Sequence, residues 1–245
     1  MQSIDGHTVV ITGASSGIGA ATARAVAAEG ADLVLAARRL DRLDDLASDL
    51  ESTHGVSATP VETDVTEREQ VDDLIATAVD EHGALDALVN NAGIGLGDDV
   101  ETLDDEDYHR MMAVNADGMF YATRAALPHL RETAGVLVFV ASFAGQYPRP
   151  HNPVYAATKW WTRGFAHSLE GQVGDDGVAV SVVNPTEVRT EFGDEDGPSQ
   201  AESYGPDEAT APEAVAEAIR FALQQDGVDT VSELDLYRRD KFAHF

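Results

Sequence analysis

Cysteine is missing altogether from this chain of 245 residues, which excludes disulfides, iron–sulfur clusters and cysteine zinc sites. Lysine is almost as rare, with Lys159 and Lys241 the only two. The longest apolar run, at 136–141, is far too short to span a bilayer, and the first residues lack the regions of a signal peptide. We therefore expect a cytoplasmic protein without a membrane partner. The histidines lack metal-ligand spacing, so no metal site is predicted.

Basic residues are scarce relative to acidic ones: Asp and Glu number 44, Lys and Arg only 16, and the formal net charge is -28. A small soluble domain usually carries a net charge of about 2–8 in magnitude. Concentrated salt screens the repulsion within an acidic coat, whereas dilute buffer leaves it to destabilise the fold. We predict a surface adapted to very high salt, with an acidic face for a cationic partner as the alternative. The lack of a basic patch predicts no nucleic-acid partner.

Apolar, β-branched runs alternate with helical patterns along the chain, and hydrophobic residues make up 43% of it. The predicted strands cover residues 7–12, 32–37, 56–61, 84–90, 136–142, 178–184 and 228–236. The predicted helices cover residues 18–29, 40–50, 68–82, 104–130, 153–173 and 212–224, the fourth with a turn or kink inside it. This alternation predicts one α/β domain, 1–245, whose doubly wound parallel sheet has helices on both faces. The irregular stretch 186–211 is the predicted substrate loop.

A glycine-rich turn, TGASSGIG at 12–19, joins the first predicted strand to the first predicted helix. Such a turn lets the backbone approach a pyrophosphate and directs the N–H groups of the helix start at the anion. Its spacing differs from the common G-x-G-x-x-G fingerprint, and a glycine turn alone could be a simple connection. The strand before it and the helix after it favour a dinucleotide site.

Two arginines, Arg38 and Arg39, follow the second predicted strand. Sites for NAD usually have an acidic residue here, which binds the ribose 2′-hydroxyl. Arginine suits a phosphate instead, because its planar guanidinium donates paired hydrogen bonds. The pair therefore favours a 2′-phosphate, with NADP(H) as the preferred cofactor and NAD(H) as the possible one. The alternative is a helix-start pair bonded to Asp41, Asp44 or Asp45.

Tyr155 and Lys159 lie four residues apart within a predicted helix. That spacing puts both side chains on one face, with Cβ atoms about 5–6 Å apart. A free tyrosine titrates near 10, and a neighbouring cation favours its phenolate. We expect Lys159 to lower the Tyr155 pKa toward the range of a general acid/base. The alternative is simple packing on the helix surface.

The remaining motifs are Asp64-Val65, Asn90-Asn91-Ala92-Gly93, Asn115, Ser142 and Asn184-Pro185. With the glycine turn and the Tyr–Lys pair, in this order and spacing, they make the chain resemble the short-chain dehydrogenase/reductase family over essentially its full length. The resemblance implies a single-domain Rossmann fold with seven parallel strands, an oxidoreductase activity and a homo-dimer or homo-tetramer.

The resemblance implies a catalytic tetrad of Asn115, Ser142, Tyr155 and Lys159. Tyr155 would exchange a proton with the carbonyl or alcohol oxygen, and Ser142 would hydrogen-bond the same oxygen. Lys159 would bind the ribose of the nicotinamide half, and Asn115 would hold a water that links Lys159 to solvent. Taken singly, Ser142 could instead cap a strand end, and Asn115 could be a residue of the helix kink.

The resemblance also implies contacts along the whole cofactor. Asp64 would bond the adenine amine, Val65 would pack on the ring, and Thr190 would bond the nicotinamide carboxamide; alternatively, Asp64 caps the helix before Thr66. The predicted cofactor-binding residues are Thr12, Gly13, Ser15, Ser16, Gly17, Ile18, Gly19, Arg38, Arg39, Asp64, Val65, Asn91, Ala92, Gly93, Tyr155, Lys159, Pro185, Val188 and Thr190.

One departure from the family concerns Thr186, which follows Pro185 where glycine is usual, so we expect a different backbone at the outer wall of the nicotinamide pocket. Tyr147, His151 and Asn152 are predicted to line the substrate pocket. We predict an NADP(H)-dependent oxidoreductase that transfers a hydride between nicotinamide and a carbonyl or secondary alcohol of a small-molecule substrate. The alternative is a nucleotide-sensing or scaffold protein that keeps this fold without the chemistry.

Overall fold

A single seven-stranded parallel sheet organises the computed structural model, which describes residues 1–97, 99–193, 199–225 and 229–243. The strand order is β3-β2-β1-β4-β5-β6-β7, and every neighbouring pair is parallel. The strands are β1 (Thr8–Thr12), β2 (Asp32–Ala37), β3 (Ala58–Glu62), β4 (Ala87–Asn90), β5 (Val136–Val140), β6 (Ala179–Pro185) and β7 (Glu233–Leu236).

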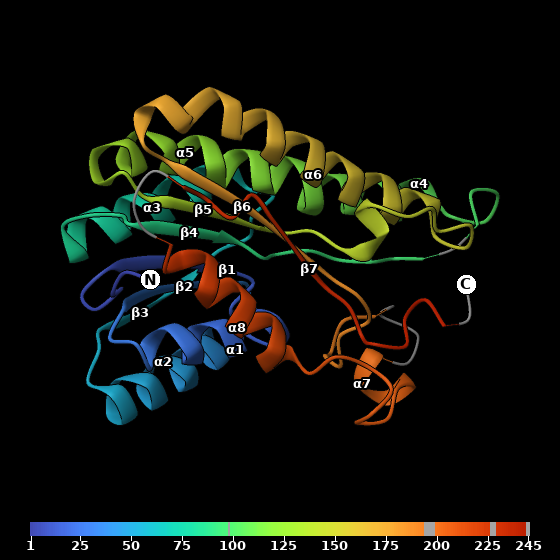
Figure 1. Ribbon diagram of the computed structural model, residues 1–245, viewed down its shortest axis with the longest axis horizontal. Coiled ribbons are helices and arrows are strands. Elements are labelled where there is room, and N and C mark those ends of the chain that lie inside the picture. The colour runs from blue at the N-terminus through green and yellow to red at the C-terminus, as the bar shows by residue number, and fades with distance from the viewer. Residues whose placement is uncertain (98, 194–198, 226–228, 244–245) are drawn as a thin grey trace.

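Helices cover both faces of the sheet (Figure 1), with α1, α2 and α8 on one face and α3, α5 and α6 on the other. The helices are α1 (Gly17–Ala27), α2 (Leu40–His54), α3 (Arg68–His82), α4 (Asp105–Met112), α5 (Met119–Thr133), α6 (Pro153–Val173), α7 (Gln200–Ser203) and α8 (Pro212–Leu223). Successive residues of a strand face opposite sides. Val9 and Ile11 of β1 accordingly pack toward α1 and α8, while Val10 packs toward α3 and α5. Burial on both faces explains the continuous apolar runs of the sequence.

The predicted α/β fold with seven parallel strands and helices on both faces is confirmed; most element ends differ by a few residues from the prediction, and three segments need description. The helix predicted at 104–130 is two α-helices, α4 and α5, separated by a π-helix at Ala113–Gly118. The strand predicted at 228–236 is confined to β7, and residues 226–228 lie outside the described part. The stretch 186–211 is not wholly irregular, because Ser199 and Glu202 form a capping box that starts α7.

The crevice at the carboxyl ends of β1 and β4 lies where the strand order reverses, which is where open α/β sheets bind ligands. The short edge strand β7 pairs with β6 and is fixed to α6 by Glu233, which accepts bonds of 2.6 and 2.9 Å from Arg163. In the described part of the chain, no helix is long and apolar enough to cross a membrane.

Candidate active site

A cavity of about 1020 Å³ opens at the carboxyl ends of the central strands. Nearly all of the predicted site residues line it, although they come from segments as far apart as 13 and 190. Among the predicted cofactor and tetrad residues, the three exceptions are Thr12, Gly19 and Asn115, which do not line the cavity. The fold therefore brings the predicted cofactor and tetrad residues together in one place.

The glycine turn forms a close-packed floor beneath one end of the cavity. Gly13 and Gly17 have φ values of +68° and +53°, which favour glycine. A Cβ on Gly19 would lie 2.3 Å from the carbonyl oxygen of Gly13. The Thr12 hydroxyl accepts 3.1 Å bonds from the amides of Asn91 and Ala92, so Thr12 shapes the turn from behind.

The start of α1 leaves backbone donors without a side-chain cap. Ser16 is the N-cap residue, and its hydroxyl makes no capping hydrogen bond to the helix. The first N–H groups of a helix have no partner within the helix and attract anions. The turn therefore has room, supplied by glycine, and unsatisfied donors that suit a pyrophosphate.

A cluster of Arg39, Arg42 and Glu191 lies at the adjoining end of the cavity. Arg39 donates to the hydroxyls of Ser15 at 2.9 Å and Ser16 at 2.8 Å, and to Glu191 at 3.1 Å. Arg42 donates to the same carboxylate at 2.7 Å. These arginines lower the pKa of Glu191. Arg39 is thus held at the glycine turn.

Within the described part of the chain, Arg39 does not bond to the alternative partners Asp41, Asp44 or Asp45. Its guanidinium bonds to Ser15, Ser16 and Glu191, and Arg38 and Arg39 both line the cavity. Sequence reasoning missed Arg42 and Glu191. The Arg42 side chain follows one helical turn after Arg38, which is the one signal that could have indicated it.

Asp64 and Val65 line the wall beyond the arginines. The Asp64 carboxylate accepts 3.0 and 2.8 Å bonds from the amide and hydroxyl of Thr66, which is the local turn that the sequence left as the alternative. Val65 is buried against Gly118 of the π-helix, where a Cβ would lie 2.8 Å from the valine side chain. A flat apolar surface is thereby fixed in the cavity wall.

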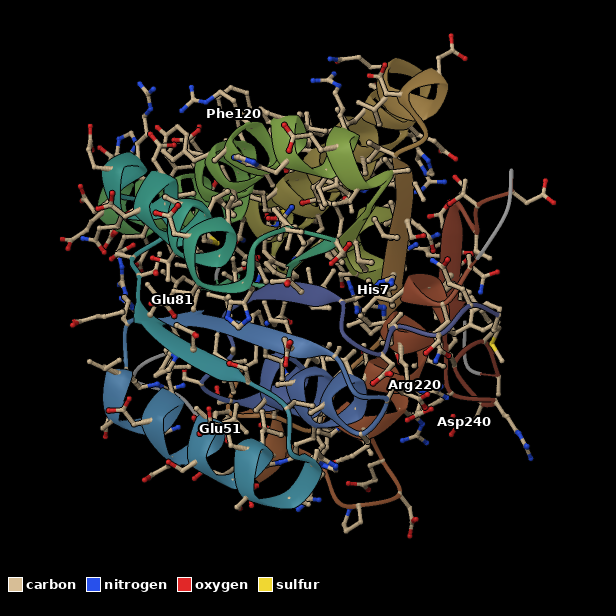
Figure 2. The ribbon with its side chains drawn as sticks, turned by 90° about the vertical axis from the view of Figure 1, so that its left-hand side faces the viewer. His7, Glu51, Glu81, Phe120, Arg220 and Asp240 are labelled. Atoms are coloured by element: carbon tan, nitrogen blue, oxygen red, sulfur yellow. The ribbon has the colours of Figure 1, made fainter. Side chains whose placement is uncertain are left out.

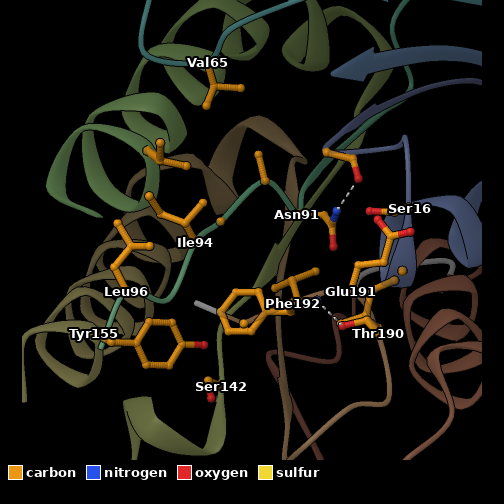
Figure 3. A pocket seen from close by; sticks show the side chains of 18 of the residues that line it. Ser16, Val65, Asn91, Ile94, Leu96, Ser142, Tyr155, Thr190, Glu191 and Phe192 are labelled. Carbon is orange, nitrogen blue, oxygen red and sulfur yellow. Dashed lines mark hydrogen bonds between the residues drawn. The ribbon is translucent and has the colours of Figure 1, made fainter. Parts of the chain in front are cut away.

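Tyr155 and Lys159, one turn apart on α6, face the cavity with Ser142 from the end of β5. Figure 3 shows the Tyr155 hydroxyl directed toward Ser142. Burial raises the pKa of Tyr155, although a hydrogen bond with Ser142 and the charge of Arg149 lower it. The Ser142 hydroxyl also accepts a 3.1 Å bond from the amide of Ala144, so it caps the short turn after the strand.

The expectation that Lys159 lowers the Tyr155 pKa is wrong for this structure, because the pKa of Tyr155 is raised and burial is the largest cause. The Lys159 ammonium lies 5.8 Å from the centre of the Tyr155 ring and donates a 3.0 Å bond to the carbonyl of Val140. Burial lowers the pKa of Lys159 to about 8. Loss of hydration thus dominates both groups.

Asn115 lies in the π-helix, and its side chain bonds to protein groups on two sides. Its amide accepts from the N–H of Ile94 and donates to the carbonyl of Ile94, both at 2.8 Å. It also donates a 3.0 Å bond to the hydroxyl of Thr158 on α6. Asn115 therefore joins the loop after β4 to the helix that carries Tyr155 and Lys159.

The substrate end is formed by other residues than those predicted, since Tyr147, His151 and Asn152 do not line the cavity. Tyr147 stacks on Phe143 at 4.4 Å, the His151 side chain is 96% exposed, and Asn152 caps α6 by accepting a bond from the amide of Tyr155. Arg149 and Phe192 line it in their place, and no sequence pattern indicated either residue.

Phe192 lies beside Tyr155, with ring centres 5.8 Å apart (Figure 3). Thr190, two residues earlier, packs against Gly17 of the glycine turn. Thr186, at the position of the usual glycine, donates a 3.3 Å backbone bond to Leu236, and its buried hydroxyl has no partner among the described residues. The segment after β6 therefore closes the outer wall of the cavity.

Comparison with known proteins identifies the family. The family model for short chain dehydrogenases matches residues 7–201. The NADP-dependent 3-hydroxy acid dehydrogenase of Schizosaccharomyces pombe is 36% identical over 232 residues, covering 91% of this chain and 89% of that protein. An uncharacterized oxidoreductase of Staphylococcus saprophyticus is 34% identical over 95% of this chain and 96% of its own.

Comparison with solved structures also finds dehydrogenases and reductases. An alcohol dehydrogenase from the archaeon Thermococcus sibiricus, complexed with 5-hydroxy-NADP, superposes with a TM-score of 0.88 at 32% identity, covering 96% of this chain and 99% of that one. L-Sorbose reductase from Gluconobacter frateurii, complexed with NADPH and L-sorbose, gives 0.85 at 29% identity, with 96% and 97% covered. The chain therefore belongs to the short-chain dehydrogenase family and is an oxidoreductase.

Proposed function

We propose that this protein transfers a hydride between NADP(H) and a carbonyl or secondary alcohol, with Tyr155 as the general acid/base. The observation that carries the proposal is the convergence of Tyr155, Ser142 and Lys159 on one cavity. A hydroxyl that donates a proton and a second hydroxyl beside it are what reduction of a carbonyl oxygen requires. The NADP-dependent relative and the NADP-bound structures support the choice of cofactor.

The cavity has groups that fit each part of NADP(H). The glycine turn and the start of α1 would hold the pyrophosphate, and Arg38 and Arg39 would hold the 2′-phosphate. Arg39 is already oriented by two hydroxyls, so little freedom remains for it to lose on binding. Since NAD(H) lacks the 2′-phosphate, it would gain nothing from these arginines.

The other cofactor contacts follow the cavity wall. Asp64 and Val65 would flank the adenine, and residues 91–93 would pass beneath the ribose. Pro185, Val188 and Thr190 would enclose the nicotinamide from the loop after β6, with Thr190 bonding its carboxamide.

During reduction the bound cofactor would supply the hydride. Side chains of the cavity protonate the carbonyl oxygen and stabilise the negative charge that develops on it. Tyr155 donates its hydroxyl proton to the carbonyl oxygen, and Ser142 hydrogen-bonds that oxygen as it gains negative charge. Lys159, which lines the cavity one helical turn after Tyr155, would bind the ribose hydroxyls. Asn115 positions Tyr155 and Lys159 by anchoring α6 through Thr158.

The test is Tyr155→Phe, which removes the proton donor and keeps the ring. We expect kcat to fall by about 10²–10⁴-fold, the usual contribution of general acid/base catalysis, while the Kd for NADPH stays unchanged. Tyr147→Phe is the matched control, because that ring stacks on Phe143 outside the cavity. Turnover retained in Tyr155→Phe would overturn the assignment. A wild-type protein that binds NADPH but reduces no aldehyde or ketone would favour the nucleotide-sensing alternative.

We further propose a cytoplasmic homo-oligomer whose surface is adapted to high salt. The charge of -28 supports the salt adaptation, and the family supports the oligomer. Sedimentation in concentrated KCl, with a monomer as the contradicting result, tests the oligomer.

A further inference from the structure

Three charged side chains from distant segments meet at the substrate end of the cavity. Arg149 comes from the loop between β5 and α6, Glu187 from the segment after β6, and Lys241 from the C-terminal segment. Glu187 accepts a 3.1 Å bond from Arg149 and bonds of 2.7 and 2.8 Å from Lys241. Both cations also lie over the ring of Phe143, at 5.0 and 4.6 Å from its centre.

The charges of this cluster do not balance, since two cations share one carboxylate. Lys241 occupies both carboxylate oxygens of Glu187, and its own side chain is only 13% exposed. Arg149 gives that carboxylate a single bond, its one hydrogen bond to the described residues, although a guanidinium has five N–H donors. Arg149 therefore keeps N–H donors that a ligand could use.

Arg149 is the member of the cluster that is placed to meet a substrate. It lines the same cavity as Ser142 and Tyr155, whereas Lys241 does not. Its charge contributes to lowering the Tyr155 pKa against the effect of burial, so its field extends to the phenol. A negatively charged group on the substrate would find donors beside the reacting carbonyl.

Basic residues are enriched among the residues that line the cavity, although they are scarce in the chain as a whole. The whole chain has 16 Lys and Arg and 44 Asp and Glu; of its described residues, five of the former but only four of the latter line the cavity. The five cations are Arg38, Arg39, Arg110, Arg149 and Lys159. The first two are at the proposed phosphate site and Lys159 is beneath Tyr155, so the phosphate site accounts for only part of this enrichment.

We propose that the substrates are oxo acids or hydroxy acids, and that Arg149 binds their carboxylate. A single guanidinium fork matches one carboxylate in a bidentate pair. The inference rests on the proposed function and adds a substrate class to it. In reduction, the oxo carbon takes the hydride of NADPH and its oxygen takes the Tyr155 proton; the products are the hydroxy acid and NADP⁺, and solvent returns the proton to Tyr155.

The test compares a charged substrate with its uncharged ester. With 3-oxobutanoate and methyl 3-oxobutanoate, the wild-type protein is expected to have the higher kcat/KM for the acid. Arg149→Gln should lower the acid-to-ester ratio of kcat/KM at least tenfold, and Arg149→Lys should restore part of it. Arg189→Gln, an exposed arginine outside the cavity, is the matched control and should leave the ratio unchanged.

A second variant should move the same ratio in the opposite direction. Glu187→Gln removes the carboxylate that competes for Arg149, so the acid-to-ester ratio should rise. Melting curves of each variant separate loss of folding from loss of selectivity, because the ratio is measured on whatever protein remains folded.

Three results would overturn the carboxylate assignment. They are an equal or better kcat/KM for the ester in the wild type, an unchanged ratio in Arg149→Gln, and a preference for dihydroxyacetone phosphate over the oxo acid. None of these would contradict NADPH-dependent carbonyl reduction. Failure of the proposed function would show itself differently, as no oxidation of NADPH with either substrate.

Discussion

The outer surface and the cavity of this protein have opposite charge. On the outside, acidic side chains such as Glu51 and Glu81 stand out from the helices that cover the sheet (Figure 2), and none of the described Asp and Glu residues is buried. Lys159 is the one buried charged side chain in the described part of the chain. Charge is therefore separated by location: carboxylates remain hydrated outside, while cations gather where anions are expected to bind.

The cations of the outer surface and those of the cavity also differ in their bonding partners. Exposed arginines pair with acids, as Arg24 does with Asp49 at 2.8 Å and Arg131 with Asp176 at 2.7 Å. Arg39 is bonded largely to hydroxyls, and Lys159 to a backbone carbonyl. Pairs at the surface contribute at most about 1 kcal/mol each. Moving charge from one region to the other therefore tests the comparison between them.

The largest expected effect is on cofactor affinity. Arg39→Asp places an acidic charge at the glycine turn, and charged hydrogen bonds contribute about 1.5–3 kcal/mol each, or roughly ten- to a hundredfold in Kd. We expect the Kd for NADPH to rise by about a hundredfold, because repulsion adds to the lost bond, with little change for NADH. Fluorescence titration with both cofactors measures the two constants.

Arg24→Asp makes the same change of charge on the outer surface and serves as the control. Its effect on NADPH affinity should be slight. Equal losses for NADPH and NADH in Arg39→Asp would mean that Arg39 does not bind the 2′-phosphate.

Salt should act on the two regions in opposite directions. Between about 0.1 M and 2 M KCl the Debye length falls from roughly 10 Å to below 3 Å. Repulsion within the acidic surface is then screened, so the melting temperature should climb steeply. Attraction between the cavity and NADPH is screened as well, so the Kd should rise several-fold over the same range.

Thermal melting without cofactor and titration with cofactor at each KCl concentration separate the two responses. A melting temperature that does not change with the KCl concentration would contradict the proposed salt adaptation. An NADPH affinity that increases with salt would contradict the view that cations of the cavity bind the phosphate.

The fold and most of the cavity lining could be predicted because their signals are local. Buried parallel strands require continuous apolar runs, and residues at strand ends meet at one edge of the sheet. The glycine turn and Ser142 follow strand ends, and Tyr155 and Lys159 lie one turn apart on α6. Their spacing alone places them in the crevice.

What the sequence did not show depends on contacts between distant segments. The π-helix around Asn115 is matched to the loop at Ile94 and to Thr158, positions 21 and 43 residues away. The raised pKa of Tyr155 depends on burial, which the Tyr-x-x-x-Lys spacing does not encode. Glu191 lies 152 residues from Arg39, and its neighbours in the sequence do not indicate that contact.

The smallest expected effect comes from substituting Glu191, an acidic residue that lines the cavity. It tests whether a negative charge inside the cavity weakens binding of the phosphate. Its carboxylate bridges Arg39 and Arg42, where the proposed 2′-phosphate would compete with it for the same donors. Glu191→Gln removes this competitor. Since the pairs are about half exposed, their strength is at most about 1 kcal/mol, so the Kd for NADPH should fall no more than about fivefold.

The arginines hold the pKa of Glu191 below its usual range, so the carboxylate is charged at neutral pH and the comparison with glutamine is a comparison of charge. The Kd for NADH should not change, because NADH has no 2′-phosphate to compete. Isothermal titration of both cofactors against wild type and Glu191→Gln measures the difference. Weaker NADPH binding in Glu191→Gln would show that Glu191 orients the arginines for the phosphate and does not compete with it.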